Sequence, residues 1–402
     1  MKILIVNVNG KNSSTGNIVY SEYKYLINKG HSALVCYGRG PLIEEDGICK
    51  FGIDAETIVH AGLARLTGYN GCFSPVSTYR LIEIIKRFKP DVIHVHEIHA
   101  YFLNIRPFFE YIYSAGIKVV MTLHCEYDYT GKCGHANECT GFVTGCGNCP
   151  DIRNYPKSLF FDHTAEMWAE KKRLFSKINP AVIVPSEWMQ ERVKKSFLSD
   201  MKVKIVHNGI NTSIFNIRDS SRLIRQRHNI DSEKKILLGV APKIMSEHKG
   251  GNWMLRLAKE LKETVHLIMI GVSERFAAED NVTLIGRISD GESLSEYYSA
   301  ADLFLICSKK ESFSLTCAEA LACGTPVAGF RAGAPEGIFS EPYAVFTEYG
   351  NMESLTETVS DRLKEQISPE KIREYAVSNF SNESMCRGYE EVIRSFAVSG
   401  DC

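Results

Sequence analysis

Two glutamates eight residues apart bracket a short loop and the first turns of a helical pattern. Glu311 lies in the loop, directly after an apolar strand pattern, and Glu319 lies on the helix. The amides from Ser314 through Leu315 to Thr316 can hold a diphosphate, because the N-terminal end of a helix carries partial positive charge. Glu311 can then reach sugar hydroxyls, and Glu319 can accept hydrogen bonds from a ribose. A solvated helix with two incidental acids is the plainer interpretation, and the strand–loop–helix setting argues against it.

Five cysteines crowd a turn-rich stretch that begins at Cys125. Cys146 and Cys149 are separated by two residues, which is the spacing of half a structural zinc site. Cys133 and Cys139 are suitable partners and would complete a set of four thiolates. The chain has 13 cysteines and no recognisable secretion signal, which indicates a reducing compartment where thiols stay reduced or bind metal. The sequence therefore favours a structural zinc ion, with disulfides and unmodified thiols as the alternatives.

Three further positions carry weaker signals. His124 ends a strand pattern, and a histidine there can bond a sugar hydroxyl or share a developing charge, although a structural strand-end histidine is the alternative. Gly16 lies in a Ser/Thr-rich turn after the first strand. Asn208 and Gly209 form a turn near the middle of the chain, either facing a ligand or simply tight.

Length and composition limit the classes of protein. A chain of 402 residues, 44% hydrophobic and 24% charged, is expected to form two or three globular domains. The formal net charge of −1 gives no reason to expect nucleic acid as a partner. The first apolar run, Ile3 to Asn7, is too short for a signal peptide, and no run approaches the roughly 18 residues of a membrane span. We expect a cytoplasmic protein, with peripheral membrane contact left open.

Strand and helix patterns alternate almost from end to end. Near-continuous apolar strands between helices predict parallel sheets covered on both faces, and the alternation runs twice, which predicts two doubly wound α/β domains. The N-terminal domain is expected at 1–205, with the Cys-rich insert at 125–156 and a closing C-terminal helix at about 382–402. The C-terminal domain is expected at 206–381. Ligands of such sheets bind beyond the carboxyl ends of the strands, so the expected site is the cleft between the two sheets.

The glutamate pair resembles the E-x7-E region of the retaining GT-B nucleotide-sugar transferases, glycosyltransferase family 4. The likeness covers most of the chain, and segment 96–104 with the Cys-rich insert resembles a branch found in bacterial capsule, exopolysaccharide and O-antigen assembly. The motifs that carry it are Glu311 to Glu319 with the run 320–327, the Gly-containing loop 13–16, the strand 91–96, the turn 208–210, and Lys249-Gly250 opening a helix.

The resemblance implies a GT-B fold, two Rossmann-like domains facing across a cleft. It implies that the C-terminal domain binds a nucleoside-diphosphate sugar and that the N-terminal domain binds most of a glycan acceptor, which would be lipid-linked. The sugar would be transferred with retention of configuration, and any membrane contact would be peripheral, at the inner face. A cofactor is not required, because a cationic side chain and helix amides can neutralise the departing diphosphate.

The same resemblance assigns roles to single residues. By analogy Glu319 binds the ribose, Glu311 the transferred sugar and Lys249 the diphosphate. Lys243 is the candidate for a second basic residue, at a spacing one residue longer than the usual pattern. His124 matches a family histidine beside the transferred sugar. Gly16 lies where the donor phosphate approaches the N-terminal domain, and Asn208-Gly209 at the domain junction.

Two other functions are considered. A sugar-nucleotide epimerase on the same fold would need a pattern of catalytic acids that the sequence does not show. A non-catalytic subunit that binds a sugar nucleotide or a glycan is opposed by the presence of Glu311, Glu319, Lys249 and His124 together. Hydrolysis of the donor would separate an enzyme from a binding subunit.

Overall fold

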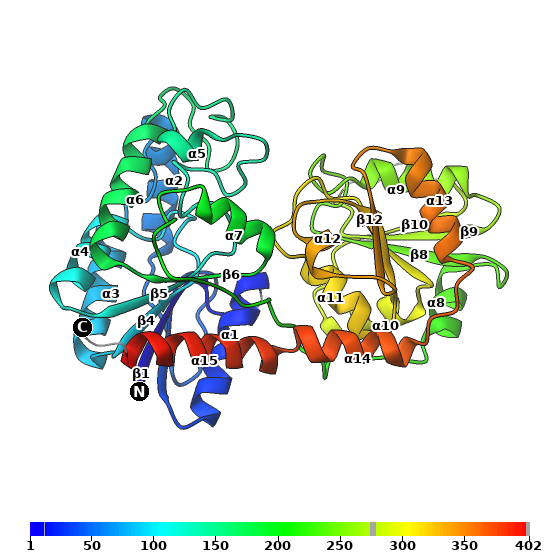
Figure 1. Cartoon of the computed structure of the whole chain (residues 1–402), viewed down its shortest axis with the longest axis horizontal. Helices are drawn as coiled ribbons and strands as arrows, with labels where there is room; N and C mark the ends of the chain where they lie inside the picture. The colour runs from blue at the N-terminus through cyan, green and yellow to red at the C-terminus, as the bar shows by residue number, and fades with distance from the viewer. Residues whose placement is uncertain (12, 274–278, 399–402) are drawn as a thin grey trace. The chain divides into compact units, whose positions relative to one another are not determined.

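The computed structural model describes residues 1–11, 13–273 and 279–398 (Figure 1). The chain forms two compact units. Unit 1 contains Met1–Val206 and the C-terminal stretch that begins at Met385, and unit 2 contains His207–Ser384. The C-terminal helix, expected at about 382–402, spans Asn382–Val398, and residues 399–402 lie outside the described residues.

Unit 1 is built on a seven-stranded sheet in which all neighbouring strands are parallel. The strand order is β3-β2-β1-β4-β5-β6-β7, so the direction of winding reverses between β1 and β4. The strands are β1 (Lys2–Asn9), β2 (Ser32–Arg39), β3 (Ile48–Lys50), β4 (Val92–Val95), β5 (Lys118–Thr122), β6 (Ala181–Val184) and β7 (Val203–Ile205).

Alternate residues of these strands pack against opposite layers of helices. Ile3 and Ile5 belong to one core with α1 and α15, whereas Leu4 and Val6 belong to another with α3, α4, α6 and α7. This two-sided burial explains why the strands read as continuous apolar runs. The helices of unit 1 are α1 (Ser14–Asn28), α2 (Asp54–Thr67), α3 (Pro75–Phe88), α4 (Ile105–Ser114), α5 (Gly141–Thr144), α6 (Thr164–Ile178), α7 (Glu187–Lys194) and α15 (Asn382–Val398).

Unit 2 repeats the plan with a six-stranded parallel sheet. Its order is β10-β9-β8-β11-β12-β13, with the reversal between β8 and β11. Its strands are β8 (Lys235–Val240), β9 (Val265–Ile270), β10 (Val282–Ile285), β11 (Leu303–Ile306), β12 (Val327–Phe330) and β13 (Ala344–Thr347).

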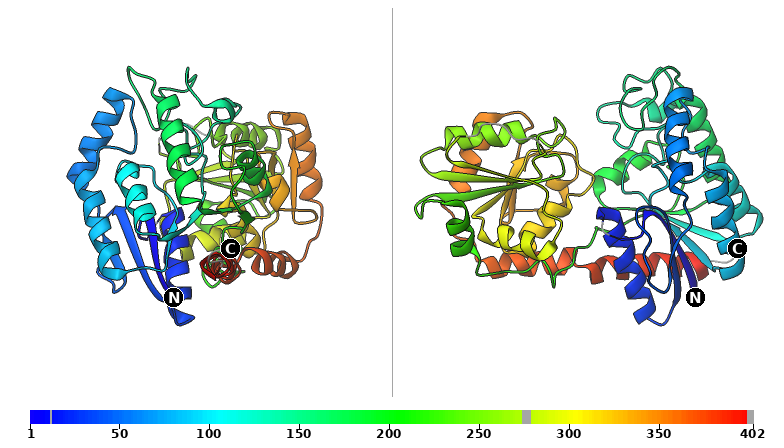
Figure 2. Two further views of the ribbon diagram at one scale, coloured as in Figure 1. Left: turned by 60° about the vertical axis from the view of Figure 1, so that its left-hand side comes forward. Right: turned by 180° about the vertical axis from the view of Figure 1, so that it is seen from behind.

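Helices cover both faces of this second sheet as well (Figure 2). Helices α9 and α13 share one core with β8, β9, β11 and β12. Both sheets confirm the predicted doubly wound α/β class. Among the described helices, none has the length and apolar character needed to cross a membrane. The helices of unit 2 are α8 (Ser221–His228), α9 (Gly251–Glu260), α10 (Gly291–Ala300), α11 (Leu315–Ala322), α12 (Pro335–Ile338), α13 (Met352–Arg362) and α14 (Pro369–Phe380).

Candidate functional site

Several of the predicted site residues follow strands where a sheet reverses its order: Gly16 follows β1, Lys243 and Lys249 follow β8, and Glu311 follows β11, whereas His124 follows β5 and Asn208 follows β7. At such a point the loops after two neighbouring strands leave in opposite directions, and open α/β sheets bind ligands in the crevice between them. In unit 1 the strands concerned are β1 and β4, and in unit 2 they are β8 and β11.

In unit 2, Lys249 and Glu311 form an ion pair. Lys249 Nζ lies 2.6 Å from Glu311 Oε1, and both side chains are partly exposed. The Glu311 amide donates to Ala332 O at 2.8 Å, which fixes the loop after β11. Gly250 brings Lys249 close, because its φ is +70° and a Cβ there would lie 2.1 Å from Cys307 O. The sequence predicted both charges, and the structure joins them.

Helix α11 begins directly after this loop. Ser314 caps it, since its hydroxyl accepts from the Cys317 amide at 3.4 Å, and Ser314 itself has a φ of +81°. The first amides of a helix, here those of Leu315 and Thr316, have no acceptor within the helix and can bind an anion. Burial, with the nearby charge of Glu311, raises the pKa of the Cys317 thiol.

Glu319 lies on α11, one turn further on. The Tyr298 hydroxyl of α10 donates to Glu319 Oε2 at 2.9 Å. Burial raises the pKa of Glu319 to about 7. The charges of Glu319 and Lys249 both act on the Cys317 thiol, so these side chains belong to one cluster.

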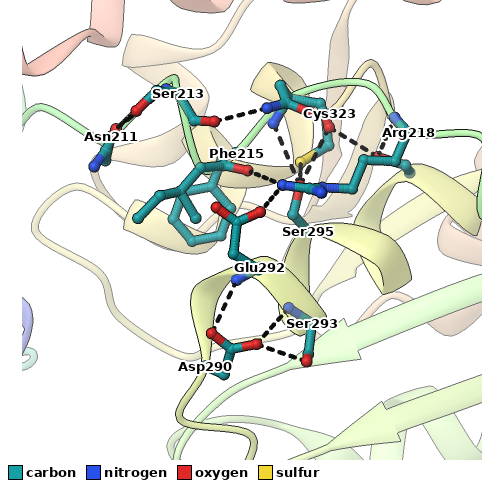
Figure 3. Close-up of polar contacts among 12 residues, drawn as sticks. Asn211, Ser213, Phe215, Arg218, Asp290, Glu292, Ser293, Ser295 and Cys323 are labelled. Atoms are coloured by element: carbon teal, nitrogen blue, oxygen red, sulfur yellow. Dashed lines mark hydrogen bonds and ion pairs between the residues drawn. The ribbon is translucent and has the colours of Figure 1, made fainter.

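A set of polar contacts holds α10, and with it Tyr298, against its neighbours (Figure 3). Asp290 caps α10 by accepting from the Ser293 amide at 2.8 Å. Arg218 forms an ion pair with Glu292 and donates to Ser295 Oγ at 3.0 Å. Ser295 Oγ also lies 3.3 Å from Cys323 Sγ, just beyond the end of α11, so α10 and α11 are joined at this point.

For three other residues predicted to bind the nucleotide-sugar donor, the structure gives less direct support. Lys243 is exposed in the loop after β8, with a φ of +52°, whereas the ion pair with Glu311 is made by Lys249. Asn208 is buried, and its Oδ1 has no hydrogen-bond partner among the described residues. A Cβ at Gly209 would lie 2.7 Å from Asn382 Cα, so close packing already explains this glycine.

In unit 1, His124 follows β5 and is buried. Its Nε2 lies 2.9 Å from Nδ1 of His96, which follows β4. Gly16 lies within the first turn of α1, not in a loop before it, because Ser13 caps α1 by accepting from the Gly16 amide at 3.0 Å. The neighbouring Thr15 hydroxyl donates to Glu97 Oε2 at 3.0 Å.

A second polar group lies beside His124. Glu97, His99 and Cys125 place their ligand atoms within 4.8 Å of one another. Burial opposes charge on His99, but Cys125 and Glu97 raise its pKa well above the usual value. Burial likewise opposes ionisation of Glu97, but the contact with His99 lowers its pKa to about 2. At neutral pH these two side chains therefore form an ion pair.

The Cys-rich insert contains a single described helical turn, α5, and is held by buried charges. Lys132 Nζ donates to the carbonyls of Ile152, Asn154 and Pro156 at 2.7, 2.9 and 2.8 Å. Lys171 of α6 donates to the carbonyls of Tyr127 and Thr130 at 2.5 and 2.9 Å.

The four predicted zinc ligands gather within this insert. The thiols of Cys133 and Cys149 are hydrogen-bonded to each other, and Cys146 interacts with Cys139 and Cys149. Backbone amides donate to two of the sulfurs, Gly131 N to Cys146 Sγ at 3.2 Å and Gly141 N to Cys139 Sγ at 3.4 Å. Among the described residues, the sets of three ligand atoms within 4.8 Å lie elsewhere in unit 1, so the four sulfurs would have to move closer together to share one ion.

Sequence reasoning missed two buried partners of these residues, Glu22 and Tyr298. Glu22 contacts His94 and His96, and Tyr298 contacts Glu319. A signal for Glu22 was present, because its position between Ile18 and Leu26 places it on the apolar stripe of α1. A carboxylate on such a stripe is rarely buried without a partner.

Two family models match the chain. One, described as glycosyltransferase family 4, matches residues 15–214, and the other, described as glycosyl transferases group 1, matches residues 220–378. WcaC of Escherichia coli, named as a colanic acid biosynthesis glycosyl transferase, is 26% identical over 246 residues, and the match spans 59% of each chain. A 41.2 kDa protein of the cps region of Klebsiella pneumoniae is 24% identical over 79% of this chain and 82% of its own length.

The solved structures add a likeness of fold. HepE of Anabaena, determined in complex with UDP, superposes with a TM-score of 0.68 at 14% identity, over 98% of this chain and all of its own. The motifs around Glu311 and Glu319, the two doubly wound sheets and the matched family models agree. The chain belongs to the GT-B glycosyltransferases of family 4, whose C-terminal half is the group 1 domain.

Proposed function

We propose that the protein transfers a sugar, with retention of configuration, from a nucleoside-diphosphate sugar to a glycan acceptor in the synthesis of a bacterial surface polysaccharide. The observation that carries the proposal is the Lys249–Glu311 ion pair beside the first turn of α11. The names of WcaC and of the cps-region protein support the polysaccharide context, and UDP-glucose bound to HepE supports the donor class.

The residues of unit 2 suggest how the donor is held. The amides that open α11, together with the Lys249 ammonium, can bind the diphosphate and stabilise it as it departs. A bound diphosphate would compete with Glu311 for Lys249, which would leave the carboxylate to accept hydrogen bonds from the transferred sugar. Glu319 would accept from the ribose. We assign no covalent nucleophile and no metal to the transfer, so the chain contributes positioning and charge stabilisation.

Lys243 and the glycines keep the roles that the family resemblance gives them. We propose that Lys243 adds positive charge near the diphosphate, and that Gly16 lets the α1 backbone approach the donor. The buried Oδ1 of Asn208 has no hydrogen-bond partner among the described residues, and a hydroxyl of the bound donor could donate a hydrogen bond to it. His124 would contact the transferred sugar.

We further propose that Cys133, Cys139, Cys146 and Cys149 bind one structural zinc ion. Cys133 and Cys149 are already hydrogen-bonded to each other, and Cys146 interacts electrostatically with Cys139 and Cys149. Amide donors to sulfur, here to Cys139 and Cys146, are the outer contacts that orient such ligands. Bound zinc would supply rigidity to the insert. His124 stands directly before this insert, so its order affects the acceptor side of the site.

The acceptor is proposed to be lipid-linked, reached from the cytoplasmic face of a membrane. Helix α2 supports this, because its apolar side faces solvent while Thr57 and His60 are buried. Ile58 is 73% exposed, and Phe160, in a segment joined to α2 by the Leu159 N to Arg65 O hydrogen bond of 2.8 Å, is 69% exposed. The apolar side consists of Ala55, Ile58, Val59, Gly62, Leu63 and Leu66.

Basic side chains lie near the C-terminal end of α2. Arg65 is on α2, and Lys157 is two residues before Leu159, whose amide bonds to Arg65 O; both side chains are exposed and complement anionic headgroups. An exposed apolar surface of this kind, with cationic neighbours, fits a lipid surface.

Removing either member of the ion pair is expected to abolish most transfer. Lys249→Met and Glu311→Gln should each lower kcat by about two orders of magnitude, because each removes a group that stabilises the departing diphosphate or the sugar. Steady-state transfer and donor hydrolysis measure this. Lys235→Met is the matched control, since it breaks the 3.0 Å ion pair with Asp302 at the amino end of β8, away from the loops that hold Lys249 and Glu311. Near-normal turnover in either test variant would contradict the donor assignment, and a protein that never hydrolyses donor would be a binding subunit.

Donor binding is expected to strengthen with pH through Glu319. Burial raises its pKa to about 7, and a ribose hydroxyl donates to the ionised carboxylate, so the donor KM should fall as the pH rises from about 6 to about 8. Glu319→Gln should raise KM more than it lowers kcat and should remove this pH dependence. A variant with unchanged KM and a collapsed kcat would show that Glu319 acts on the reaction itself.

Zinc analysis tests the insert. Protein purified without a histidine tag should contain about one equivalent of zinc, and Cys146→Ser should lose the metal and impair transfer while unit 2 stays folded. Cys72→Ser, outside the insert, should keep both metal and activity. Far less than one equivalent, with all four thiols reactive, would show that the insert is held by its lysines alone.

Vesicle sedimentation tests the α2 surface. The chain should bind vesicles that contain anionic lipid, and Leu63→Glu should lower binding at least about fivefold because it places a charge within the apolar side. Leu223→Glu, an exposed leucine of α8, is the control. Equal binding of the two variants, or no binding by the unaltered chain, would refute membrane contact through α2.

A further inference from the structure

Glu22 is a buried carboxylate that contacts two histidines at once. Its Oε1 lies 2.6 Å from His94 Nδ1, and its Oε2 lies 2.9 Å from His96 Nε2. All three side chains are fully buried. The rings of His94 and His96 also lie edge-on to Tyr389 of α15, at centroid distances of 5.2 and 5.8 Å. The arrangement is therefore sealed from water on the α15 side.

The hydrogen bonds specify where the protons are. Burial alone would keep Glu22 protonated, but the two histidines lower its pKa to about 2, so it is an anion that only accepts hydrogen bonds. Each histidine must then direct an N–H toward it. Burial lowers the pKa of His96 to about 4, so His96 is neutral and has one N–H, at Nε2.

The proton position on His124 follows from its contact with His96. Since His96 donates through Nε2, its Nδ1 can only accept, and the atom 2.9 Å away is Nε2 of His124. That nitrogen must carry the proton. Burial lowers the pKa of His124 to about 3, so the ring is neutral at physiological pH. The carboxylates of Glu97 and Glu22 act in the opposite direction and do not reverse this result.

We propose that Glu22, acting through His96, is a positioning residue that holds His124 as the neutral imidazole protonated on Nε2. Nδ1 is then the nitrogen of His124 that accepts a hydrogen bond. The effect on transfer rests on the proposed function, whereas the protonation state rests on the hydrogen bonds together with the lowered pKa values of His96 and His124. Glu22, His94 and His96 satisfy one another directly, so the set needs no cation.

Nitrogen NMR of protein labelled with ¹⁵N-histidine tests the proposal, with His124→Ala and His96→Phe used for assignment. Near pH 7.5, His124 of the unaltered chain should show a protonated Nε2 and an unprotonated Nδ1. In Glu22→Leu the carboxylate that orders His96 is gone, so His124 should become a mixture of both tautomers, and kcat should fall about tenfold at unchanged donor KM. Thr122→Val, which removes only the hydroxyl 2.7 Å from His94 Nε2, should leave the His124 signals as they are.

Several outcomes would overturn the proposal. They are a His124 proton on Nδ1, a cationic His124, metal coordination by His94 and His96, or a folded Glu22→Leu variant with an unchanged His124 tautomer. Should Glu22→Leu fail to fold, the spectrum of the unaltered chain decides alone. If His124→Ala keeps full transfer, the role of His124 in the reaction is wrong, and the tautomer measurement still stands or fails by itself.

Discussion

Parallel strand pairing is the constraint on which the rest of this structure depends. When every strand of a sheet runs the same way, the carboxyl ends of all strands lie on one side of the sheet, and each chain return must cross back over, usually as a helix. The loops that leave β1, β4, β5, β8 and β11 are therefore places where polar side chains meet without disturbing the cores. The Lys249–Glu311 pair and the His96–His124 contact are both products of this rule.

Buried charge is the second organising feature of unit 1. A charged group inside a protein is costly unless hydrogen bonds compensate it. Lys171 is fully buried and donates to main-chain carbonyls of the insert, and burial lowers its pKa. Glu22 is compensated by two histidines. Lys171 thus organises the insert, which has little regular secondary structure. Glu22 organises His94 and His96, at the carboxyl end of β4.

The fold class and most of the polar site could be predicted, because strands buried on both faces and a strand–loop–helix with two glutamates are local patterns. The short β3 and the helix α2 were not predicted. The apolar residues of α2 recur at the spacing of a helix, so this pattern was present in the sequence and was missed, and the structure shows that they face outward. Gly16 was expected in a loop and lies in the first turn of α1 because Ser13, not a later residue, caps the helix.

Contacts between residues on different elements could not be predicted from the sequence, for a different reason. Tyr298 and Glu319 are close only because α10 and α11 pack together, and nothing in their spacing along the chain reveals this. The Lys249–Glu311 contact likewise depends on Gly250, whose positive φ lets one loop reach another strand. Such pairs follow from the packing of elements and not from local pattern.

The packing of α15 has a consequence for biosynthesis. Met385, Tyr389 and Ile393 complete a core whose other members, such as Ile3 and Ile18, are made first. A ribosome adds about 5–20 residues each second, so the first sheet of this protein waits many seconds for the helix that covers one of its faces. During that time Ile3, Ile5 and their neighbours are exposed to other nascent chains. Because α15 follows unit 2 in the chain, unit 1 reaches its native state only after unit 2 has been synthesised, and the docking of α15 is the step that completes its fold.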